Sequence, residues 1–332
     1  MAQLFTWSNI TQSFLVPRPS ITEKNLPDQI GKVHIITGGY AGVGKELTDI
    51  LYQHNATVYV AGRNRDKATT AIDAIRANYP TSQGRLEFLS IDLSDLTTIA
   101  PAVQQFTAKE KRLDVLVNNA GVMMPFGGSQ GKQGHELHMV TNCLGPFLFT
   151  KGLIPILKQT AACCPPASVR VIWASSLITN LLSPTSGVDI GEDGAPVMAS
   201  FRLTNYAQSK AANNLYAAEF SRRYGDHGIL SVAFNPGNLN SELKRHLNFW
   251  GLLVAKLITY SPRYGAYTEL YSGWSQGIKI EDGGIFVVPW GRNGNDFLRE
   301  DIRKVLDESK TDENSAVRRF WDWSDREVAP FA

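Results

Sequence analysis

The feature that most constrains the fold is a glycine-rich turn between an expected strand and an expected helix. The segment reads Thr-Gly-Gly-Tyr-Ala-Gly-Val-Gly over residues 37–44, after the β-rich run 33–37 and before a helical run, 45–54. Glycines let the backbone turn tightly and approach a pyrophosphate, and the start of a helix offers free N–H groups and a positive dipole end. The segment therefore predicts a phosphate cradle, with an ordinary turn as the alternative.

Strands and helices alternate along the rest of the chain. Apolar β-rich runs predict strands, and 3.6-residue periodicity predicts helices. The strands are expected at 33–37, 57–61, 86–91, 115–117, 169–174, 229–234 and 284–288, and the helices at 45–54, 66–78, 94–109, 135–160 and 206–224. This alternation is typical of βαβ units in an α/β protein with a parallel sheet.

One domain is the simplest organisation. Residues 1–30 contain Pro17, Pro19 and Pro27 and are expected to form an irregular arm on a single domain spanning 31–332. Apolar stretches near 177–203 and 238–262 are expected insertions that wall a pocket for a bulky apolar ligand. Packing against the C-terminal segment or a second subunit is the alternative for both.

Composition excludes several classes of function. Hydrophobic residues make up 43% of the 332 residues and charged residues 19%, which is enough for a sizeable core. A net charge of +2 without a basic run disfavours nucleic acid as a partner. Three cysteines without a CxxC pair favour a reducing, cytoplasmic location and no structural zinc. The N-terminus does not resemble a signal peptide, and no apolar run reaches the length of a membrane span. His135 and His138 could contribute to a metal site, but the sequence shows no third ligand for them.

Several further motifs follow the glycine loop in a fixed order. They are Asp92-Leu93, Asn118-Asn119-Ala120-Gly121, Asn142, Ser175-Ser176, Tyr206-Ala-Gln-Ser-Lys210 and Pro236-Gly237. Together with TGxxxGxG they resemble the short-chain dehydrogenase/reductase superfamily from about residue 31 to 237. The segments 22–27 and 320–323 resemble fungal members of the branch that contains retinol dehydrogenases and the WW-domain oxidoreductase. The resemblance implies a Rossmann-type, doubly wound sheet of about seven strands in the order 3-2-1-4-5-6-7, with helices on both faces.

The end of the second expected strand points to NADP(H) as cofactor. An acidic side chain there favours NAD, whereas an arginine can pair with the 2′-phosphate of NADP. By resemblance, Gly62 takes the acidic position and Arg63 follows it, so no carboxylate repels the phosphate and a guanidinium can bind it. A solvated surface arginine is the alternative.

Tyr206 and Lys210 are the expected acid/base pair. Residues four apart share one helix face, so both side chains can address one site. Carbonyl reduction requires a proton for the developing alkoxide. A nearby ammonium and the positive charge of the nicotinamide are expected to stabilise the phenolate, and lowering the tyrosine pKa by roughly three units needs about 4 kcal/mol of differential interaction. By resemblance, Ser176, or its neighbour Ser175, orients the substrate oxygen. Asn142 is then expected to support a proton relay to Lys210.

The resemblance also assigns a cofactor-binding set. It comprises Gly38, Tyr40, Gly42, Val43, Gly44, Arg63, Asn64, Asp92, Leu93, Asn118, Asn119, Ala120, Gly121, Tyr206, Lys210, Pro236, Gly237, Leu239 and Ser241. The alternative for Asp92 is a structural role, in which its side chain caps a helix or stabilises a turn.

The sequence thus predicts an NADP(H)-dependent oxidoreductase that interconverts a carbonyl and an alcohol. The substrate is expected to be a small molecule, bulky and apolar, such as a fungal secondary metabolite or a lipid-like alcohol, and a homodimer or homotetramer fits the family. A cofactor-binding sensor or scaffold without chemistry, and non-redox chemistry by the same residues, are the rival hypotheses.

Overall fold

The computed structural model describes residues 7–13, 16–123, 128–240 and 259–332. Their strands form one sheet in the order β3-β2-β1-β4-β5-β6-β7-β8. The strands are β1 (Val33–Thr37), β2 (Thr57–Gly62), β3 (Arg85–Ser90), β4 (Val115–Asn118), β5 (Val169–Ala174), β6 (Ile229–Phe234), β7 (Phe286–Val288) and β8 (Arg292–Asn293). All neighbouring pairs are parallel except β7 and β8. The doubly wound parallel sheet is therefore confirmed, with a short antiparallel edge strand that was not predicted.

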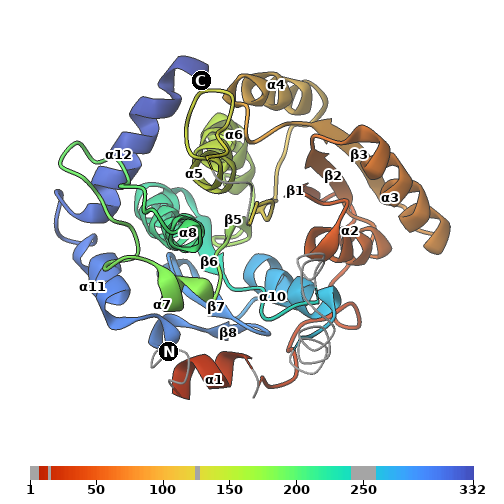
Figure 1. Cartoon of the computed structure of the whole chain (residues 1–332). Coiled ribbons are helices and arrows are strands. Elements are labelled where there is room, and N and C mark those ends of the chain that lie inside the picture. Colours follow the sequence, from red (N-terminus) through yellow and green to blue (C-terminus); the bar gives the residue numbers. More distant parts are fainter. Residues whose placement is uncertain (1–6, 14–15, 124–127, 241–258) are drawn as a thin grey trace, which may run out of the picture.

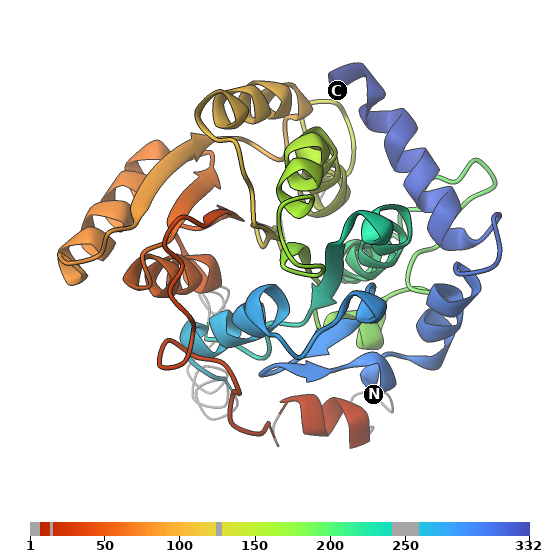
Figure 2. The same cartoon turned by 180° about the vertical axis from the view of Figure 1, so that it is seen from behind.

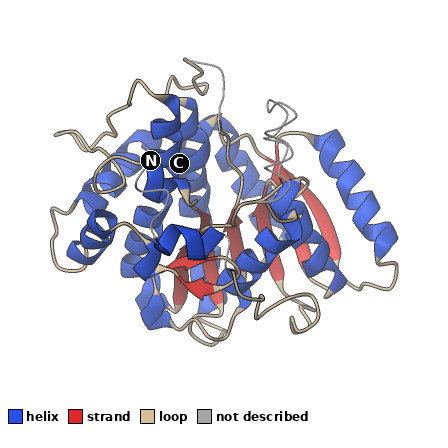
Figure 3. Cartoon of the chain, turned by 60° about the horizontal axis from the view of Figure 1, so that its bottom comes forward, coloured by secondary structure: helices blue, strands red, loops and turns tan. Residues whose placement is uncertain are grey.

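Helices cover both faces of the sheet (Figures 1 and 2). The described helices are α1 (Trp7–Ser13), α2 (Gly42–Gln53), α3 (Arg65–Asn78), α4 (Ile99–Lys109), α5 (Leu137–Met139), α6 (Gly145–Ala161), α7 (Ile178–Leu182), α8 (Arg202–Tyr224), α10 (Pro262–Trp274), α11 (Glu300–Glu308) and α12 (Ala316–Val328). Figure 3 shows the strands as a layer enclosed by these helices.

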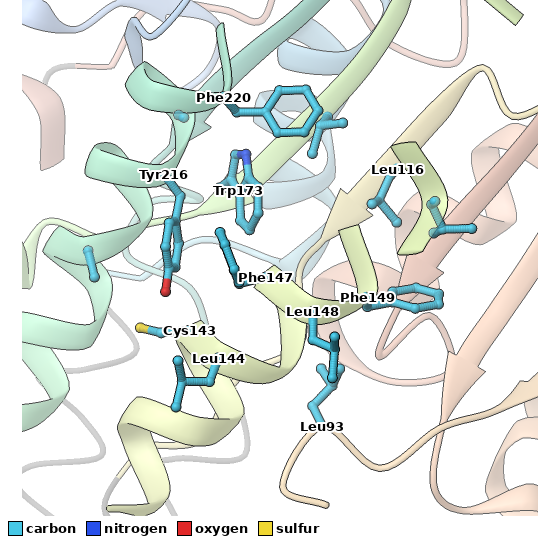
Figure 4. Close-up of a cluster of buried hydrophobic side chains, with 14 of the residues drawn as sticks. Leu93, Leu116, Cys143, Leu144, Phe147, Leu148, Phe149, Trp173, Tyr216 and Phe220 are labelled. Atoms are coloured by element: carbon cyan, nitrogen blue, oxygen red, sulfur yellow. The ribbon is translucent and has the colours of Figure 1, made fainter. Parts of the chain in front are cut away.

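The core consists of two apolar clusters, one on each face. The larger one joins the sheet to α4, α6, α8 and α12, and the smaller one joins it to α2, α3 and α10. Figure 4 shows the centre of the larger cluster, where Tyr216 stacks on Phe147 at 5.1 Å between ring centroids and lies 5.4 Å from Trp173. Continuous burial along β1, β4, β5 and β6 explains why their sequences are mostly apolar without strict alternation, because a parallel sheet is covered on both sides.

One helical stretch, Leu137–Ala161, is long and apolar enough to cross a membrane by length and composition alone, and 72% of its apolar window is buried inside the protein. It contains a π-helical turn over Val140–Leu144 between α5 and α6. Pro146 lies in the first turn of α6, where the missing N–H of a proline is tolerated best. Pro155 lies inside the same helix. This stretch supplies the face on which α8 packs.

The N-terminal arm differs from the expected irregular segment, because residues 7–13 form α1. The order of the strands reverses between β1 and β4, since successive strands proceed outward from β1 in one direction and from β4 in the other. Ligands of open α/β sheets bind at the carboxyl ends of the strands at such a switch point. The fold therefore places the candidate site where β1, β4 and β5 end.

Candidate active site

The glycine loop connects β1 to α2 in the geometry of a phosphate cradle. Gly38 has φ +70° and Gly42 has φ +54°, values that side chains rarely adopt. A Cβ on Gly44 would lie 2.6 Å from Asn119 Nδ2 and 2.8 Å from Gly38 O. Ala41 precedes α2 and makes no side-chain cap, so the N–H groups of the first turn have no capping side chain. The loop thus fits a diphosphate, which would accept from these groups.

The two asparagines at the end of β4 make internal hydrogen bonds, Asn119 to the start of the glycine loop and Asn118 to α6. Asn119 Nδ2 donates to Thr37 O at 2.9 Å, and Ala120 N donates to Thr37 Oγ1 at 3.0 Å. Asn118 is buried and donates to Thr150 Oγ1 at 2.9 Å. The side chain of Thr48 closes the loop from α2 by donating to Gly39 O and Gly44 O. The sequence analysis named Thr37 only as part of the glycine-loop motif, with no role for its hydroxyl, and it did not single out Thr48.

The residues expected at the adenosine end lie after β2 and β3. The side chain of Arg63 is exposed, and Asn64 caps α3 by accepting from Lys67 N at 2.9 Å. Asp92 Oδ1 accepts from the backbone N and the hydroxyl of Ser94, which is the turn geometry that the sequence left open as an alternative. Leu93 is buried in the larger core cluster, so any contact that it makes with a cofactor comes from its backbone.

Tyr206 and Lys210 lie on one face of α8, near the end of β5. Lys210 Nζ is 6.0 Å from the centroid of the Tyr206 ring and donates to Ala174 O at 2.9 Å. A Cβ on Gly121 would lie 3.1 Å from Lys210 Nζ and 3.0 Å from Asn142 Oδ1, so a glycine is needed beside them. The motifs after β4, β5 and β6 are thereby brought together around the carboxyl ends of these strands.

Burial opposes the charged forms of both titrating groups. It raises the pKa of Tyr206 to about 12, against a smaller lowering by a hydrogen bond with Ser176. It lowers the pKa of Lys210 to about 8. The sequence analysis expected Lys210 to lower the tyrosine pKa, whereas in the protein alone burial raises it and the hydrogen bond with Ser176 is what opposes the rise.

The two serines after β5 have different environments. Ser175 is buried, donates to Lys210 O at 2.9 Å and accepts from Asn214 Nδ2 at 3.0 Å. Ser176 is partly exposed and is the serine that hydrogen-bonds Tyr206. Alternation along an extended chain explains why neighbours point to opposite sides. The geometry favours Ser176 as the serine of the site.

Asn142 lies in the π-helical turn and joins three segments. Its Nδ2 donates to Ser209 Oγ at 2.9 Å and to Val122 O at 3.1 Å, and its Oδ1 accepts from Val122 N at 2.8 Å. π-helical turns often occur at functional sites, and here the turn accommodates a buried polar side chain inside an apolar helix. Asn142 therefore fixes the chain after Gly121 beside Lys210.

The segment after β6 approaches the glycine loop from the other side. Gly237 has φ +92°, and a Cβ there would lie 2.6 Å from the Trp290 ring. A Cβ on Gly265 of α10 would touch both Leu239 and Val43, which places Leu239 beside the start of α2. Ser241, the remaining candidate here, lies outside the described residues, as do residues 242–258 of the second expected insertion.

One histidine beside Tyr206 was considered only as a metal ligand. The His138 ring is buried, lies 5.8 Å from the Tyr206 ring and binds Glu136 Oε1 through Nδ1 at 2.6 Å. His135 instead faces Glu327 at 3.5 Å and the Trp323 ring. The described residues hold no cluster of three metal-binding side chains.

Apolar side chains remain exposed just before Tyr206. Val197 is 50% exposed, Met198 36% and Phe201 58%. Phe201 directly precedes α8, so the first expected insertion carries exposed apolar groups within two helical turns of the phenol. Exposed side chains of this size in one segment favour a ligand or partner contact.

Known proteins resemble this chain over most of its length. Residues 32–183 match the family model for short chain dehydrogenases. A short-chain dehydrogenase/reductase of Phomopsis amygdali is 43% identical over 323 residues and covers 94% of each chain. The short-chain dehydrogenase/reductase bet4 of Neocamarosporium betae is 38% identical over 332 residues, covering 97% of this chain and 93% of the relative.

Solved structures share the fold at lower identity. The NADPH-bound carbonyl reductase from chicken fatty liver has a TM-score of 0.57 at 20% identity and covers 80% of this chain and 98% of its own. The Pseudomonas aeruginosa RhlG/NADP active-site complex has a TM-score of 0.59 at 21% identity and covers 80% of this chain and 96% of its own. At such identities the likeness concerns the architecture.

Proposed function

Because this chain belongs to the short-chain dehydrogenase/reductase family and is an oxidoreductase that uses a nicotinamide cofactor, we propose that it reduces a bulky, apolar carbonyl compound with NADPH. The observation that carries the proposal is the convergence of Ser176, Tyr206 and Lys210 beside the chain that Asn142 fixes. The fungal relatives and the exposed apolar segment favour a secondary metabolite over a polar sugar or acid as substrate.

The residues present fit a dinucleotide. A Cβ at Gly44 would fill the turn, and the uncapped start of α2 offers donors to a diphosphate. Arg63 is exposed after β2 and carries the positive charge that a 2′-phosphate needs. When bound, the cofactor supplies the hydride. NADP-bound neighbours with the same fold agree with this choice of nucleotide.

The side chains supply the proton and the orientation. Ser176 would donate to the carbonyl oxygen and hold it toward the Tyr206 hydroxyl, which would transfer its proton as negative charge develops on that oxygen. Lys210, anchored on Ala174 O, would stabilise the resulting phenolate and hold the ribose. Asn142 would support the relay that reprotonates the phenol, a role that remains a proposal for this residue.

The pKa directions favour the reductive direction. A tyrosine whose pKa is raised to about 12 is protonated at neutral pH, as a proton donor must be. A lysine with a pKa of about 8 is still mainly an ammonium at pH 7. Oxidation would begin from the phenolate, which burial disfavours.

The first test is turnover of Tyr206→Phe with Tyr224→Phe, at the other end of α8, as control. Loss of the proton donor is expected to lower kcat by roughly 10²–10⁴-fold while NADPH affinity stays within a factor of about two. The control is expected to retain wild-type turnover. Near-normal turnover of Tyr206→Phe would refute the mechanism.

The second test is fluorescence titration with NADPH and NADH. Wild-type protein is expected to bind NADPH more tightly, and Arg63→Ala is expected to remove most of that preference, whereas Arg319→Ala, exposed on α12, should not. Binding of neither nucleotide would refute the proposal. Tight NADPH binding without reduction of any apolar ketone or aldehyde would instead favour the sensor or scaffold hypothesis.

A further inference from the structure

We propose that the N-terminal helix α1 is a strap that holds the Pro236–Gly237 turn in place and so positions the nicotinamide end of the cofactor. The inference rests on the proposed function, because it assigns that turn to the nicotinamide. In Figure 1, α1 lies far along the sheet from β1 and α2, beside β8. The helix is therefore well placed to act on one end of a bound dinucleotide and not on the other.

The strap reaches the turn through buried carboxamides. Asn235, directly after β6, donates from Nδ2 to Gln12 Oε1 at 3.2 Å. Its Oδ1 accepts from Gly237 N at 3.0 Å. Both side chains are at most 2% exposed. Asn235 thus uses one end of its amide to hold the turn and the other to contact α1.

The same hydrogen-bond network continues to helix α7, which follows β5. Gln12 Nε2 donates to Asn9 Oδ1 at 3.0 Å, and that oxygen also accepts from Asn180 Nδ2 at 3.2 Å. Asn180 belongs to α7, close after Ser176, and accepts from Arg299 N at 3.0 Å. Four buried amides therefore link the turn after β6 to the helix after β5 by way of α1.

The chemistry of this network suits positioning. Carboxamides are uncharged, so the network keeps its contacts across a wide pH range. A buried donor or acceptor that loses its partner destabilises the fold by more than the hydrogen bond stabilised it, so breaking one bond of the network disfavours the others as well. Arg292 adds an anchor by donating from Nη2 to Thr11 O at 3.3 Å.

The turn requires such support because its conformation is unusual. Gly237 has φ +92° and packs against the Trp290 ring, so its amide must be aimed by a fixed acceptor. The backbone N–H of Asn235 donates to Val287 O at 2.8 Å, so the backbone of this residue is fixed by the sheet. Its side chain is the part that can change position. We expect removal of Gln12 to free Asn235 and loosen the turn while β6 remains intact.

The experiment compares Gln12→Leu with Gln105→Leu, the same substitution at an exposed position of α4. Two probes are titrated: NADPH, and 2′,5′-ADP, which has the adenosine end without the nicotinamide. Gln12→Leu is expected to weaken NADPH binding about tenfold and to reduce the fluorescence of bound nicotinamide, while 2′,5′-ADP affinity changes less than twofold. Gln105→Leu is expected to change neither affinity.

The outcomes separate this inference from the proposed function. Equal losses of both probes, with a lower melting temperature, would indicate general destabilisation and overturn the strap. Unchanged NADPH binding in Gln12→Leu would overturn it as well. Failure of the wild-type protein to bind either probe would instead refute the proposed cofactor. If Gln12→Leu does not fold, Gln12→Asn, which shortens the side chain by one methylene, is expected to show the same selective loss.

Discussion

Lys210→Met should make the protein more stable at neutral pH while removing its activity. Lys210 is only 6% exposed, and its ammonium donates to Ala174 O. A buried ammonium without a carboxylate partner destabilises the folded state, whereas methionine fills a similar volume without charge. Such a residue is retained for chemistry at the expense of stability.

The magnitude follows from the displaced pKa. Burial lowers the pKa of Lys210 from 10.5 to about 8. At roughly 1.4 kcal/mol per pKa unit, the charged lysine destabilises the fold at pH 7 by about 3 kcal/mol. The substitution also removes one hydrogen bond, worth about 1 kcal/mol, although Asn213 Nδ2 still donates to Ala174 O at 3.0 Å. We therefore expect a net gain of about 2 kcal/mol.

The pH dependence gives an independent check. Between pH 8 and 10.5 the unfolded chain holds a proton on Lys210 that the folded protein has released, so wild-type stability gains with rising pH. The destabilisation is complete below pH 8 and fades above it. Cys143 and Tyr206 have raised pKa values and act in the opposite direction at alkaline pH, but both remain in the variant. The difference between the two proteins therefore reports the lysine together with its electrostatic coupling to Cys143, which is smaller than the effect of burial on either group.

The assay is urea unfolding of both proteins at pH 7 and pH 9.5, followed by tryptophan fluorescence. The stability advantage of Lys210→Met is expected to shrink from about 2 kcal/mol to near zero over this interval. A variant less stable than wild type at pH 7, or an advantage that does not change with pH, would show that Lys210 is not a destabilising buried cation.

Three further predictions concern single side chains. Gly44→Ala would bring a Cβ within 2.6 Å of Asn119 Nδ2, so NADPH affinity measured by fluorescence should fall at least about tenfold; wild-type affinity would contradict the cradle geometry. Ser176→Ala should lower kcat by roughly 10²-fold without loss of stability, whereas Ser175→Ala should lower the free energy of unfolding by about 1–3 kcal/mol and retain turnover; the reverse pattern would exchange the two roles. Glu269 is fully buried and its pKa is raised well above 4.5, so its ionisation weakens the fold as pH rises. Glu269→Gln should therefore be more stable than wild type at pH 8 and equal to it at pH 4.5, and equal stability at both pH values would argue against this account.

The cofactor-binding half of the fold was predictable because its signals are local. Strands β1, β4, β5 and β6 are mostly apolar runs buried along their whole length, and β2 is buried except at its ends, whereas β3 alternates between buried and more exposed residues. The glycine loop directly adjoins the strand and the helix that it connects. These signals predicted the parallel sheet, and the motif resemblance predicted the family and the strand order; all three are confirmed. The candidate site residues remain predictions about function, although the structure brings most of them to one edge of the sheet.

Helix α10 and the strap had no such signal. The buried residues of α10 are mostly small or polar, such as Gly265, Thr268 and Ser272, so the segment lacks the apolar periodicity of a core helix. Gln12 and Asn235 are 223 residues apart, and no local pattern relates them. The choice between Ser175 and Ser176 likewise depended on partners from α8.

Residues near the two ends of the second expected insertion, 238–262, form a parallel bridge that pairs Leu239 with Tyr260. Hydrogen bonds of 2.7 Å and 2.8 Å hold this bridge. The ends of this segment are thus joined whatever lies between them. Doubling the length of a flexible loop with fixed ends costs only about 0.6 kcal/mol. The number of residues between Leu239 and Tyr260 can therefore change at little thermodynamic cost while the bridge keeps these two residues side by side. Related enzymes that must accept different substrates can therefore vary the chain between these two residues and leave the sheet and its glycine loop unchanged.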